Sequence, residues 1–188
     1  MIAAAPNLWW LMRVELFLAT AILTLVLASG AIGRARSNAI PWLDLTLMTL
    51  TLMLGLHLSG WNAYGIGFLR SYAGDSLSMV FKTLLILCTI FSVWLAKKDD
   101  GWAGQRGAFF CALTLCGLLG MFFLVSSLDF LVFFLALELT GLSLYLLTAY
   151  SRKNPRSSEA GIKYLILGAL SAALFVLGLA LVIASTHS

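Results

Sequence analysis

Four ionisable residues of this sequence are expected within the membrane and are its candidates for chemistry, namely Glu15, Lys82, Glu138 and Lys163. His57, near the end of an apolar stretch, is a further candidate. A charge near the middle of a lipid bilayer costs at least about 2.5–3.5 kcal/mol on insertion scales. Such a side chain therefore faces protein or water, or it changes its protonation state. We expect residues in this setting to be able to carry protons across a membrane.

Glu138 is the strongest of these candidates, because it lies near the middle of the apolar stretch 129–150. A carboxylate at that depth must contact protein or water, or stay protonated. One interpretation is a proton-carrying site, and the other is a carboxyl group that packs by hydrogen bonding to a neighbouring helix. We favour the first, since a Gln or a Ser could provide such packing more easily.

The two lysines lie closer to the ends of their stretches, so each has two interpretations. Lys163 is near the start of the stretch 160–185, where its amine can extend to the cytoplasmic surface. If it bends inward instead, its axial distance from Glu138 is on the order of 10–15 Å, which water molecules could bridge. Lys82, near the periplasmic end of the stretch 77–96, can likewise extend to the surface or take part in proton transfer.

Glu15 and His57 have structural explanations that we favour over a role in proton transfer. Glu15 closely follows Arg13, so the two are expected to form a charge pair at the membrane interface. His57 lies near the end of an apolar stretch and is expected to be a packed polar residue. Both nevertheless stay candidates for a proton path.

Other kinds of site have no support in the residue pattern. Cys88, Cys111 and Cys116 lie in apolar runs without metal-ligand spacing to His57 or His187, so we expect neither a metal site nor a disulfide framework. Outside the apolar stretches there is no nucleotide-binding glycine motif and no nucleophile–base pair. We therefore expect no catalytic residues on this chain. The basic residues stand at the ends of the apolar stretches, where orientation and lipid headgroups explain them, so we expect no nucleic-acid partner.

The composition predicts the setting of the candidate residues. Of the 188 residues, 61% are hydrophobic and 11% are charged, whereas soluble domains carry about a quarter charged residues. Soluble globular and disordered proteins are thereby excluded. A lone strand in lipid would leave its backbone groups unpaired, so the expected fold is an all-α integral membrane protein.

Six apolar stretches are long enough to span a bilayer, whose core of about 30 Å needs roughly 20 residues per helix. We expect them to form a single membrane domain over 1–188, a bundle of about six transmembrane helices. The stretches cover about 8–33, 41–59, 77–96, 107–126, 129–150 and 160–185.

The basic residues predict the orientation of this bundle. The connections after the first, third and fifth stretches carry most of the Lys and Arg residues, namely Arg34, Arg36, Lys97, Lys98, Arg106, Arg152, Lys153 and Arg156. By the positive-inside rule this side is cytoplasmic, so both termini are periplasmic. Tryptophans near span ends are typical of a membrane interface: Trp9, Trp10, Trp42, Trp61 and Trp102. We expect a multi-pass protein of the bacterial inner membrane, in contact with lipid.

Small residues predict close helix packing in two of the stretches. Gly117 and Gly120 give the fourth stretch a short small-residue face. Small residues let membrane helices approach each other closely, so we expect the sixth stretch to pack on protein rather than lipid. Its face is longer and consists of Gly161, Gly168, Ala172 and Gly178.

Polar residues between the stretches predict helix caps. Asp129 can accept hydrogen bonds from the free N–H groups at the start of the fifth helix. The run 157–159 (SSE) is expected to do the same for the sixth helix, after Pro155 interrupts the preceding one. Asp44 is expected to cap or pair near the start of the second helix.

Two motifs give the sequence a family resemblance. The runs 135–145 (LALELTGLSLY) and 156–171 (RSSEAGIKYLILGALS) are similar to the fifth- and sixth-span motifs of the N subunit of NADH-quinone oxidoreductase, respiratory complex I. The second match is the more specific one. The runs 74–78 (GDSLS) and 14–16 (VEL) also resemble this family, so the likeness covers most of the chain.

The resemblance implies an antiporter-like subunit that translocates protons when quinone reduction elsewhere in the complex drives it. Such a subunit has no redox centre, so NADH, FMN, iron–sulfur clusters and quinone are expected on other subunits, and other membrane subunits of the complex are its partners. Glu138 matches the family's key glutamate of the fifth span, and Lys163 matches its sixth-span lysine. Glu159 also matches a motif position, although capping is sufficient to explain it.

The sequence departs from the family in length. Family members continue with a broken seventh helix that carries a lysine and with a second, pseudo-symmetric repeat. Three accounts are open: a second chain supplies the remaining spans, the sequence is a fragment, or the subunit is shortened and structural, without its own proton path. A related subunit of a membrane-bound hydrogenase or of a cation/proton antiporter complex is a further alternative.

Overall fold

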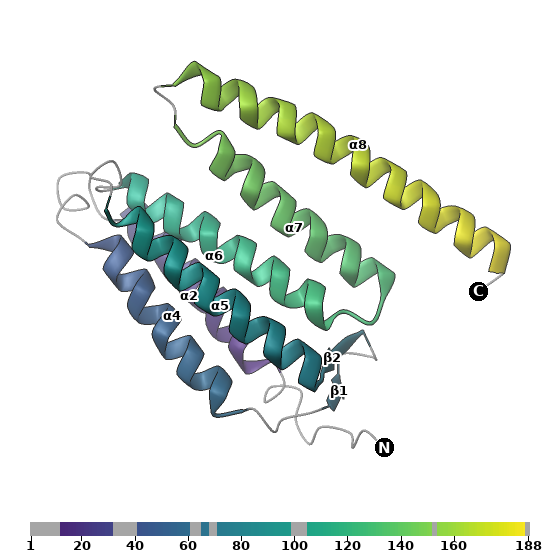
Figure 1. The fold of residues 1–188 in the computed structure, drawn as a ribbon, viewed down its shortest axis with the longest axis horizontal. Helices are drawn as coiled ribbons and strands as arrows, with labels where there is room; N and C mark the ends of the chain where they lie inside the picture. The colour runs from purple at the N-terminus through teal and green to yellow at the C-terminus, as the bar shows by residue number, and fades with distance from the viewer. Residues whose placement is uncertain are drawn as a thin grey trace.

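The computed structural model of the chain describes residues 12–31, 41–60, 65–67, 71–98, 105–151 and 154–186. Six helices lie side by side in this part (Figure 1): α2 (Arg13–Ala31), α4 (Trp42–Leu58), α5 (Ser76–Ala96), α6 (Gln105–Ser126), α7 (Phe130–Thr148) and α8 (Pro155–Thr186). Five are long and apolar enough to cross a membrane, and α4, with 17 residues, is slightly shorter. The expected helical membrane bundle is thereby confirmed.

A short hairpin interrupts the expected all-helical architecture. Strands β1 (Gly65–Gly67) and β2 (Tyr72–Gly74) pair antiparallel, with Gly67 opposite Tyr72. Tyr72 also forms an isolated bridge with Ser127, and the Leu128 N–H donates to the Ser71 carbonyl oxygen at 2.9 Å. The hairpin is therefore hydrogen-bonded to the turn between α6 and α7. Strands of three residues are too short to show an alternating pattern, so the sequence did not predict them.

The apolar core lies where α2, α4, α5 and α6 meet. Leu18 of α2, Leu50 of α4, Ile86 of α5 and Leu118 and Phe122 of α6 are all almost completely buried. Each helix contributes one stripe to this core, and α2, α4 and α5 leave much of their apolar surface exposed. Exposed Leu and Phe side chains are expected on a helix that faces lipid, because lipid is as apolar as the side chains themselves.

Helices α7 and α8 form an outer layer on one side of this core (Figure 1). α7 approaches α6 closely at Gly120, where an added Cβ would lie 2.8 Å from the backbone nitrogen of Thr140. α8 approaches α7 at Gly161, where an added Cβ would lie 3.0 Å from the Cα of Ala149. The glycines of the fourth and sixth stretches thus lie at two successive close contacts.

The rest of the small-residue face of α8 has fewer contacts. Gly168 lies against the ring of Tyr145, and Ala172 is half-buried. An added Cβ at Gly178, by contrast, would meet nothing within 4 Å among the described residues. Most other side chains of α8 are exposed, so the described residues cover only the α7 side of this helix.

Two aspartates stand at the helix ends as the sequence indicates. Asp129 is the N-cap of α7, and its carboxylate accepts from the Leu131 N–H at 3.4 Å. Asp44, in the first turn of α4, pairs with Lys97 at the end of α5, with 2.5 Å between the charged atoms. This ion pair is half-exposed, so water screens it.

The cap of α8 differs from the expected one. The helix begins at Pro155, earlier than the sequence indicated, and Asn154 caps it by accepting from the Arg156 N–H at 3.1 Å. Proline fits the first helical position because its missing N–H would be unpaired there anyway. Ser157 instead donates to the Thr148 carbonyl oxygen at 2.6 Å, which joins the start of α8 to the end of α7.

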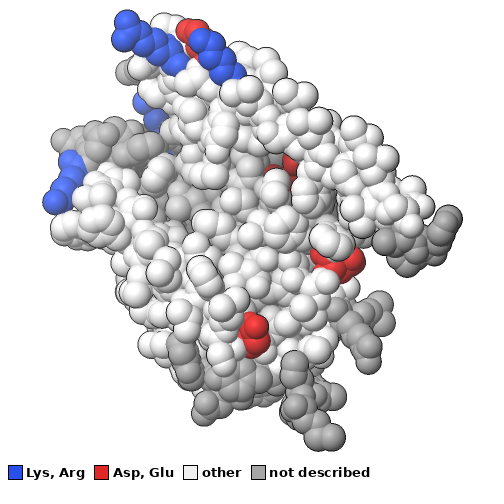
Figure 2. Space-filling model, turned by 45° about the vertical axis from the view of Figure 1, so that its right-hand side comes forward, with Lys and Arg blue, Asp and Glu red and all other residues white. Residues whose placement is uncertain are grey.

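Basic side chains gather at one end of the bundle (Figure 2). Lys97 and Lys98 follow α5, while Arg106 and Arg156 stand at the starts of α6 and α8. These helix ends lie on the same side (Figure 1). It is the side that the positive-inside rule places in the cytoplasm, and the orientation of the chain in a membrane stays a prediction.

Some residues of the orientation argument lie outside the described ranges: Trp9, Trp10, Arg34, Arg36, Trp61, Trp102, Arg152 and Lys153. Trp42 is described, and its side chain is buried in the core at the start of α4. It therefore packs against protein, although it stands at a span end as an interfacial tryptophan would.

The contact at Gly161 predicts which glycine of α8 tolerates a side chain. Gly161→Leu should lower the free energy of unfolding by about 1–3 kcal/mol, because the main chain of Ala149 cannot move aside. Gly178→Leu is the matched control and should be nearly neutral. Denaturant titration of the purified chain in detergent measures both. Equal effects would contradict the observed α7–α8 contact.

Candidate functional site

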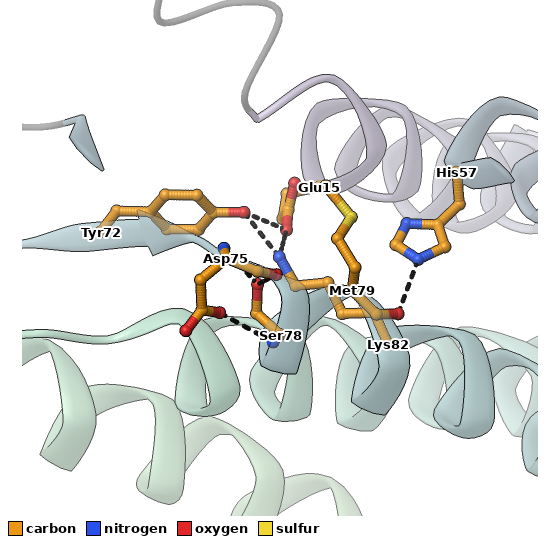
Figure 3. Close-up of polar contacts among 7 residues, drawn as sticks. All are labelled: Glu15, His57, Tyr72, Asp75, Ser78, Met79 and Lys82. Atoms are coloured by element: carbon orange, nitrogen blue, oxygen red, sulfur yellow. Dashed lines mark hydrogen bonds and ion pairs between the residues drawn. The ribbon is translucent and has the colours of Figure 1, made fainter. Parts of the chain in front are cut away.

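Glu15, Tyr72 and Lys82 form a closed polar cluster where α2, β2 and α5 meet (Figure 3). The Lys82 Nζ donates to the Glu15 Oε1 at 2.6 Å and to the Tyr72 hydroxyl at 2.7 Å. The Tyr72 hydroxyl in turn donates to the same Oε1 at 2.6 Å. All three residues are at most 4% exposed. The cluster is thus a ring of three hydrogen bonds inside an apolar bundle.

Local structure fixes the position of each of these side chains. α5 begins with a capping box, in which the Asp75 carboxylate accepts from the Ser78 N–H at 2.8 Å and the Ser78 hydroxyl accepts from the Asp75 N–H at 2.9 Å. This cap sets where α5 starts and hence which face carries Lys82. Glu15 stands in the first turn of α2, and the hairpin brings Tyr72 in from the side.

The cluster corrects two expectations about its charged members. Glu15 does not form the expected pair with Arg13, because its side chain is enclosed by protein and pairs with Lys82. Lys82 does not extend to the surface, because its ammonium points to that carboxylate. Arg13, the expected partner of Glu15, donates to the Leu56 carbonyl oxygen at 2.7 Å. Two enclosed opposite charges stabilise each other, whereas either one alone would be strongly unfavourable.

The Glu15 carboxylate is incompletely hydrogen-bonded. Both donors converge on Oε1, while the buried Oε2 has no hydrogen-bond partner among the residues that the structure describes. The buried Ser126 hydroxyl oxygen of α6 is in the same situation. An ionised carboxylate offers about four acceptor positions. Two donors on one oxygen therefore leave this charge less well compensated than a fully bonded carboxylate.

His57 lies next to the cluster and joins α4 to α5. Its Nε2 is 3.0 Å from the Met79 carbonyl oxygen, one helical turn before Lys82 (Figure 3). The geometry makes this nitrogen a donor, because a carbonyl can only accept. The side chain is buried. Packing explains this arrangement, and membership of a proton path stays a prediction.

Tyr72 is the member of the cluster that the sequence did not indicate. It stands in a Gly-rich connection, with no apolar stretch around it to mark it as enclosed. Burial and the nearby Glu15 carboxylate raise the pKa of Tyr72 above its ordinary value. The phenol therefore stays protonated at neutral pH and remains a hydrogen-bond donor.

Glu138 lies apart from this cluster, half-buried near the middle of α7. Two aromatic contacts fix the antiparallel register of α7 and α8: Tyr145 packs edge-on against Tyr164 at 4.7 Å between centroids, and Phe134 stacks on Phe175 at 5.8 Å. This register places Glu138 at the level of Ser171. Tyr145, seven residues further, lies on the same stripe of α7, so Glu138 is on the side that faces α8.

Lys163 points away from the middle of the bundle. Its Nζ pairs with Glu159, one turn closer to the start of α8, at 2.5 Å, and both side chains are largely exposed. The same register places Lys163 about eight positions from the level of Glu138, on the order of 12 Å along the axis. The two residues that the family motifs single out are thus separate in this chain, and their roles stay predictions.

No group of three or more His, Cys, Asp or Glu side chains that could hold a metal ion occurs in the part of the chain that the structure describes. Cys111 is buried beside Thr46, with 3.3 Å between sulfur and hydroxyl oxygen. This contact is typical of a packed thiol.

Known proteins resemble the chain in both sequence and structure. A family model described as "NADH:quinone oxidoreductase/Mrp antiporter, TM" matches residues 127–188, a segment that contains Glu138 and Lys163. NAD(P)H-quinone oxidoreductase subunit 2 of Synechocystis sp. is 35% identical over 150 residues, which are 79% of this chain and 28% of that protein. NADH-quinone oxidoreductase subunit N 2 of Rhizobium meliloti is 31% identical over 183 residues, 97% of this chain and 38% of that one.

A solved structure agrees with these relatives. A chain of the respiratory complex I from Thermus thermophilus with bound Aureothin superposes with a TM-score of 0.76 at 31% identity, over 93% of this chain and 37% of that chain. This chain spans about a third of the length of the proteins that it matches. The resemblance inferred from the motifs is confirmed for the N-terminal part of such a subunit.

The enclosed ion pair predicts that replacing Lys82 lowers the free energy of unfolding much more than replacing Lys97. Lys82→Met should lower the free energy of unfolding by about 3–5 kcal/mol, because Glu15 would keep a buried charge without its partner. Adding Glu15→Gln should recover much of this loss, since the unpaired charge is then removed. Denaturant titration in detergent measures the single and the double variant.

Lys97→Met is the control for this comparison, because it breaks the half-exposed pair with Asp44. Its cost should stay below about 1 kcal/mol. If Lys82→Met were no more harmful than this control, Glu15 and Lys82 would not form an enclosed charge pair.

Proposed function

We propose that this chain, similar to the N-terminal part of an antiporter-like subunit, is a membrane subunit of an NADH-quinone oxidoreductase that takes part in proton translocation coupled to quinone reduction. The observation that carries the proposal is Glu138, a carboxyl group near the middle of α7, inside the segment that the family model matches. A carboxyl group in an apolar span can bind and release a proton, which the apolar side chains around it cannot.

The proposed role is that of a non-redox subunit, with no catalytic chemistry on this chain alone. NADH, FMN, iron–sulfur clusters and quinone are then held by other subunits, and the other membrane subunits of the complex are its partners. A second chain that supplies further spans is a candidate partner as well. The setting is an energy-transducing membrane, the bacterial inner membrane, which the chain crosses several times in contact with lipid.

Several residues could support proton transfer around Glu138. Its register opposite Ser171 places a hydroxyl group nearby on α8. Lys163 is separated from it by on the order of 12 Å, a distance that water molecules or a further protein segment would have to bridge. Glu15 and Lys82 form a second ionisable unit on the other side of α6, with His57 next to it.

Three alternative functions keep the same fold. A structural or assembly subunit without its own proton path is favoured by the close glycine contacts of α8, because Gly161 and Gly168 would then matter for their shape alone. A subunit of a cation/proton antiporter complex is favoured by the matching family model, whose description includes Mrp antiporters. A related membrane-bound hydrogenase subunit is the remaining member of this group.

Replacement of Glu138 tests the proposed function. Glu138→Gln keeps the shape and a hydrogen-bonding group but cannot exchange a proton at neutral pH. In inverted membrane vesicles of a strain that carries the variant, NADH-driven proton uptake should fall at least about tenfold, in the range usual for losing a positioned proton carrier. The complex should still assemble, as seen by native electrophoresis.

Asp44→Asn is the matched control, because it removes a carboxylate outside the middle of the spans. It should leave proton uptake unchanged. Full proton uptake in the Glu138→Gln strain would contradict the proposal and favour the structural alternative, in which bulky substitutions at Gly168 or Ala172 block assembly instead. Sodium-dependent uptake would favour the antiporter alternative.

A further inference from the structure

We infer that Tyr72 is a positioning residue that controls the ionisation of Glu15, so that the position of the hairpin decides whether the Glu15–Lys82 pair is charged. The inference deepens the proposed function, because it adds a second protonatable unit to the same subunit. It depends on the geometry of the cluster and of the hairpin, and its test requires neither Glu138 nor the family motifs of α7 and α8.

The first step is the uneven hydrogen bonding of Glu15. Its Oε1 accepts from Lys82 and from Tyr72, whereas its buried Oε2 has no partner among the described residues. Half of the donors to this carboxylate thus come from the hairpin. Hydrogen bonds to a carboxylate favour its ionised form, and burial favours its neutral form. With only two donors present, the loss of one changes the balance strongly.

The second step is the availability of a proton. If the Tyr72 hydroxyl moves away, Lys82 loses an acceptor at the same moment as Glu15 loses a donor. The Nζ–H bond that points to Oε1 can then break while an O–H bond forms on Oε1. The products are a neutral amine and a carboxylic acid, so that one positive and one negative charge disappear together and no proton enters or leaves. An apolar medium favours the neutral pair over the charged one.

The third step is the attachment of the hairpin. The Leu128 N–H donates to the Ser71 carbonyl oxygen, and Tyr72 forms a bridge with Ser127, so β2 is held by the turn between α6 and α7. The Tyr72 ring also packs edge-on against Phe123 of α6 at 6.3 Å between centroids. A shift of this turn, which directly precedes α7, would therefore move the hydroxyl relative to Glu15. Tyr72 connects the ion pair of α2 and α5 to the helix that carries Glu138.

Other groups face the pair and do not replace Tyr72. His57 of α4 is close enough for its charge to interact with Glu15, Lys82 and Arg13. His57 contacts the Met79 carbonyl oxygen, and Arg13 donates to the Leu56 carbonyl oxygen. Ser126 of α6 faces Tyr72 and interacts with its hydroxyl, although its own oxygen makes no hydrogen bond of full geometry among the described residues. Among the described residues, the phenol is thus the neutral donor that reaches Glu15 from outside the helices.

Infrared titration of the full chain tests the inference. The sequence contains three glutamates, Glu15, Glu138 and Glu159, so ¹³C labelling of glutamate side chains isolates a few bands. The chain is purified and reconstituted into phosphatidylcholine vesicles, and the carbonyl band of protonated glutamate is followed against pH. Glu15→Gln identifies the band of Glu15, and Glu138→Gln shows that this band is independent of the proposed proton carrier.

Tyr72→Phe should increase the ratio of protonated to ionised Glu15 on the order of tenfold at a fixed pH, the size expected for one hydrogen bond to a charged group. Incorporation of 3-fluorotyrosine at this position strengthens the phenol as a donor and preserves the fold, so it should change the ratio in the opposite direction. Tyr164→Phe removes a hydroxyl from exposed α8 and is the control, which should leave the Glu15 band unchanged.

Two outcomes would overturn the inference. One is a Glu15 band that stays the same in Tyr72→Phe and in the fluorotyrosine protein, including the case in which Glu15 is ionised throughout in all of them. The other is an equal change in Tyr164→Phe. Neither outcome depends on proton pumping, so this test and the Glu138→Gln test of the proposed function can fail separately.

Discussion

Two opposite charges inside an apolar bundle constrain how the first helices of this protein pack. Glu15 and Lys82 are unfavourable alone and acceptable together, so α2 and α5 must bring them within hydrogen-bond distance whenever the chain folds in a membrane. The capping box at Asp75 sets the start of α5, and the hairpin adds Tyr72 as a further donor. With α2 and α5 held in this way, their apolar stripes face inward, and α6 packs against them in the common core.

The bundle separates two ionisable sites of different character. The Glu15–Lys82 pair is fully enclosed and close to neutral as a unit, and it is held by short hydrogen bonds from three elements. Glu138 is half-buried on a stripe of α7 that faces α8, without a charged partner at its level in the described register. Helix α6 lies between them and contacts both regions, through Phe122 and Phe123 near the pair and through Gly120 near α7. A displacement of α6 or of its C-terminal turn would therefore affect both sites.

The outer layer of α7 and α8 has a different physical basis from the core. Its contacts are made by glycines that admit a neighbouring main chain and by stacked aromatic rings, and there is little enclosed apolar volume. In lipid this is sufficient, because packing and not the exclusion of water drives helix association there. Most of α8 remains apolar and exposed, as expected for a surface that contacts lipid or further membrane protein.

The sequence by itself determined the class of protein, the helices of the bundle and the position of Glu138 near the middle of one of them. These follow from composition and from the length of apolar stretches, which are local properties. It also indicated the cap at Asp129 and the close-packing glycines, since a cap depends on adjacent residues and a glycine contact on residue size. The family motifs were also recognisable from the sequence, because each is one continuous run of residues.

Only the tertiary structure decided that Glu15 and Lys82 meet, because 67 positions separate them and helical periodicity does not say which helices are neighbours. The sequence therefore gave each residue a separate interfacial explanation, and burial of the pair replaced both. Tyr72 could not be found at all, since its role arises when a three-residue strand folds over the start of α5. The direction of the Lys163 side chain, which points to Glu159, was likewise decided by its rotamer and its exposure. A sequence motif specifies neither of these. The position of a charged side chain within the membrane depends on the residues with which it pairs, and the fold determines which residues those are.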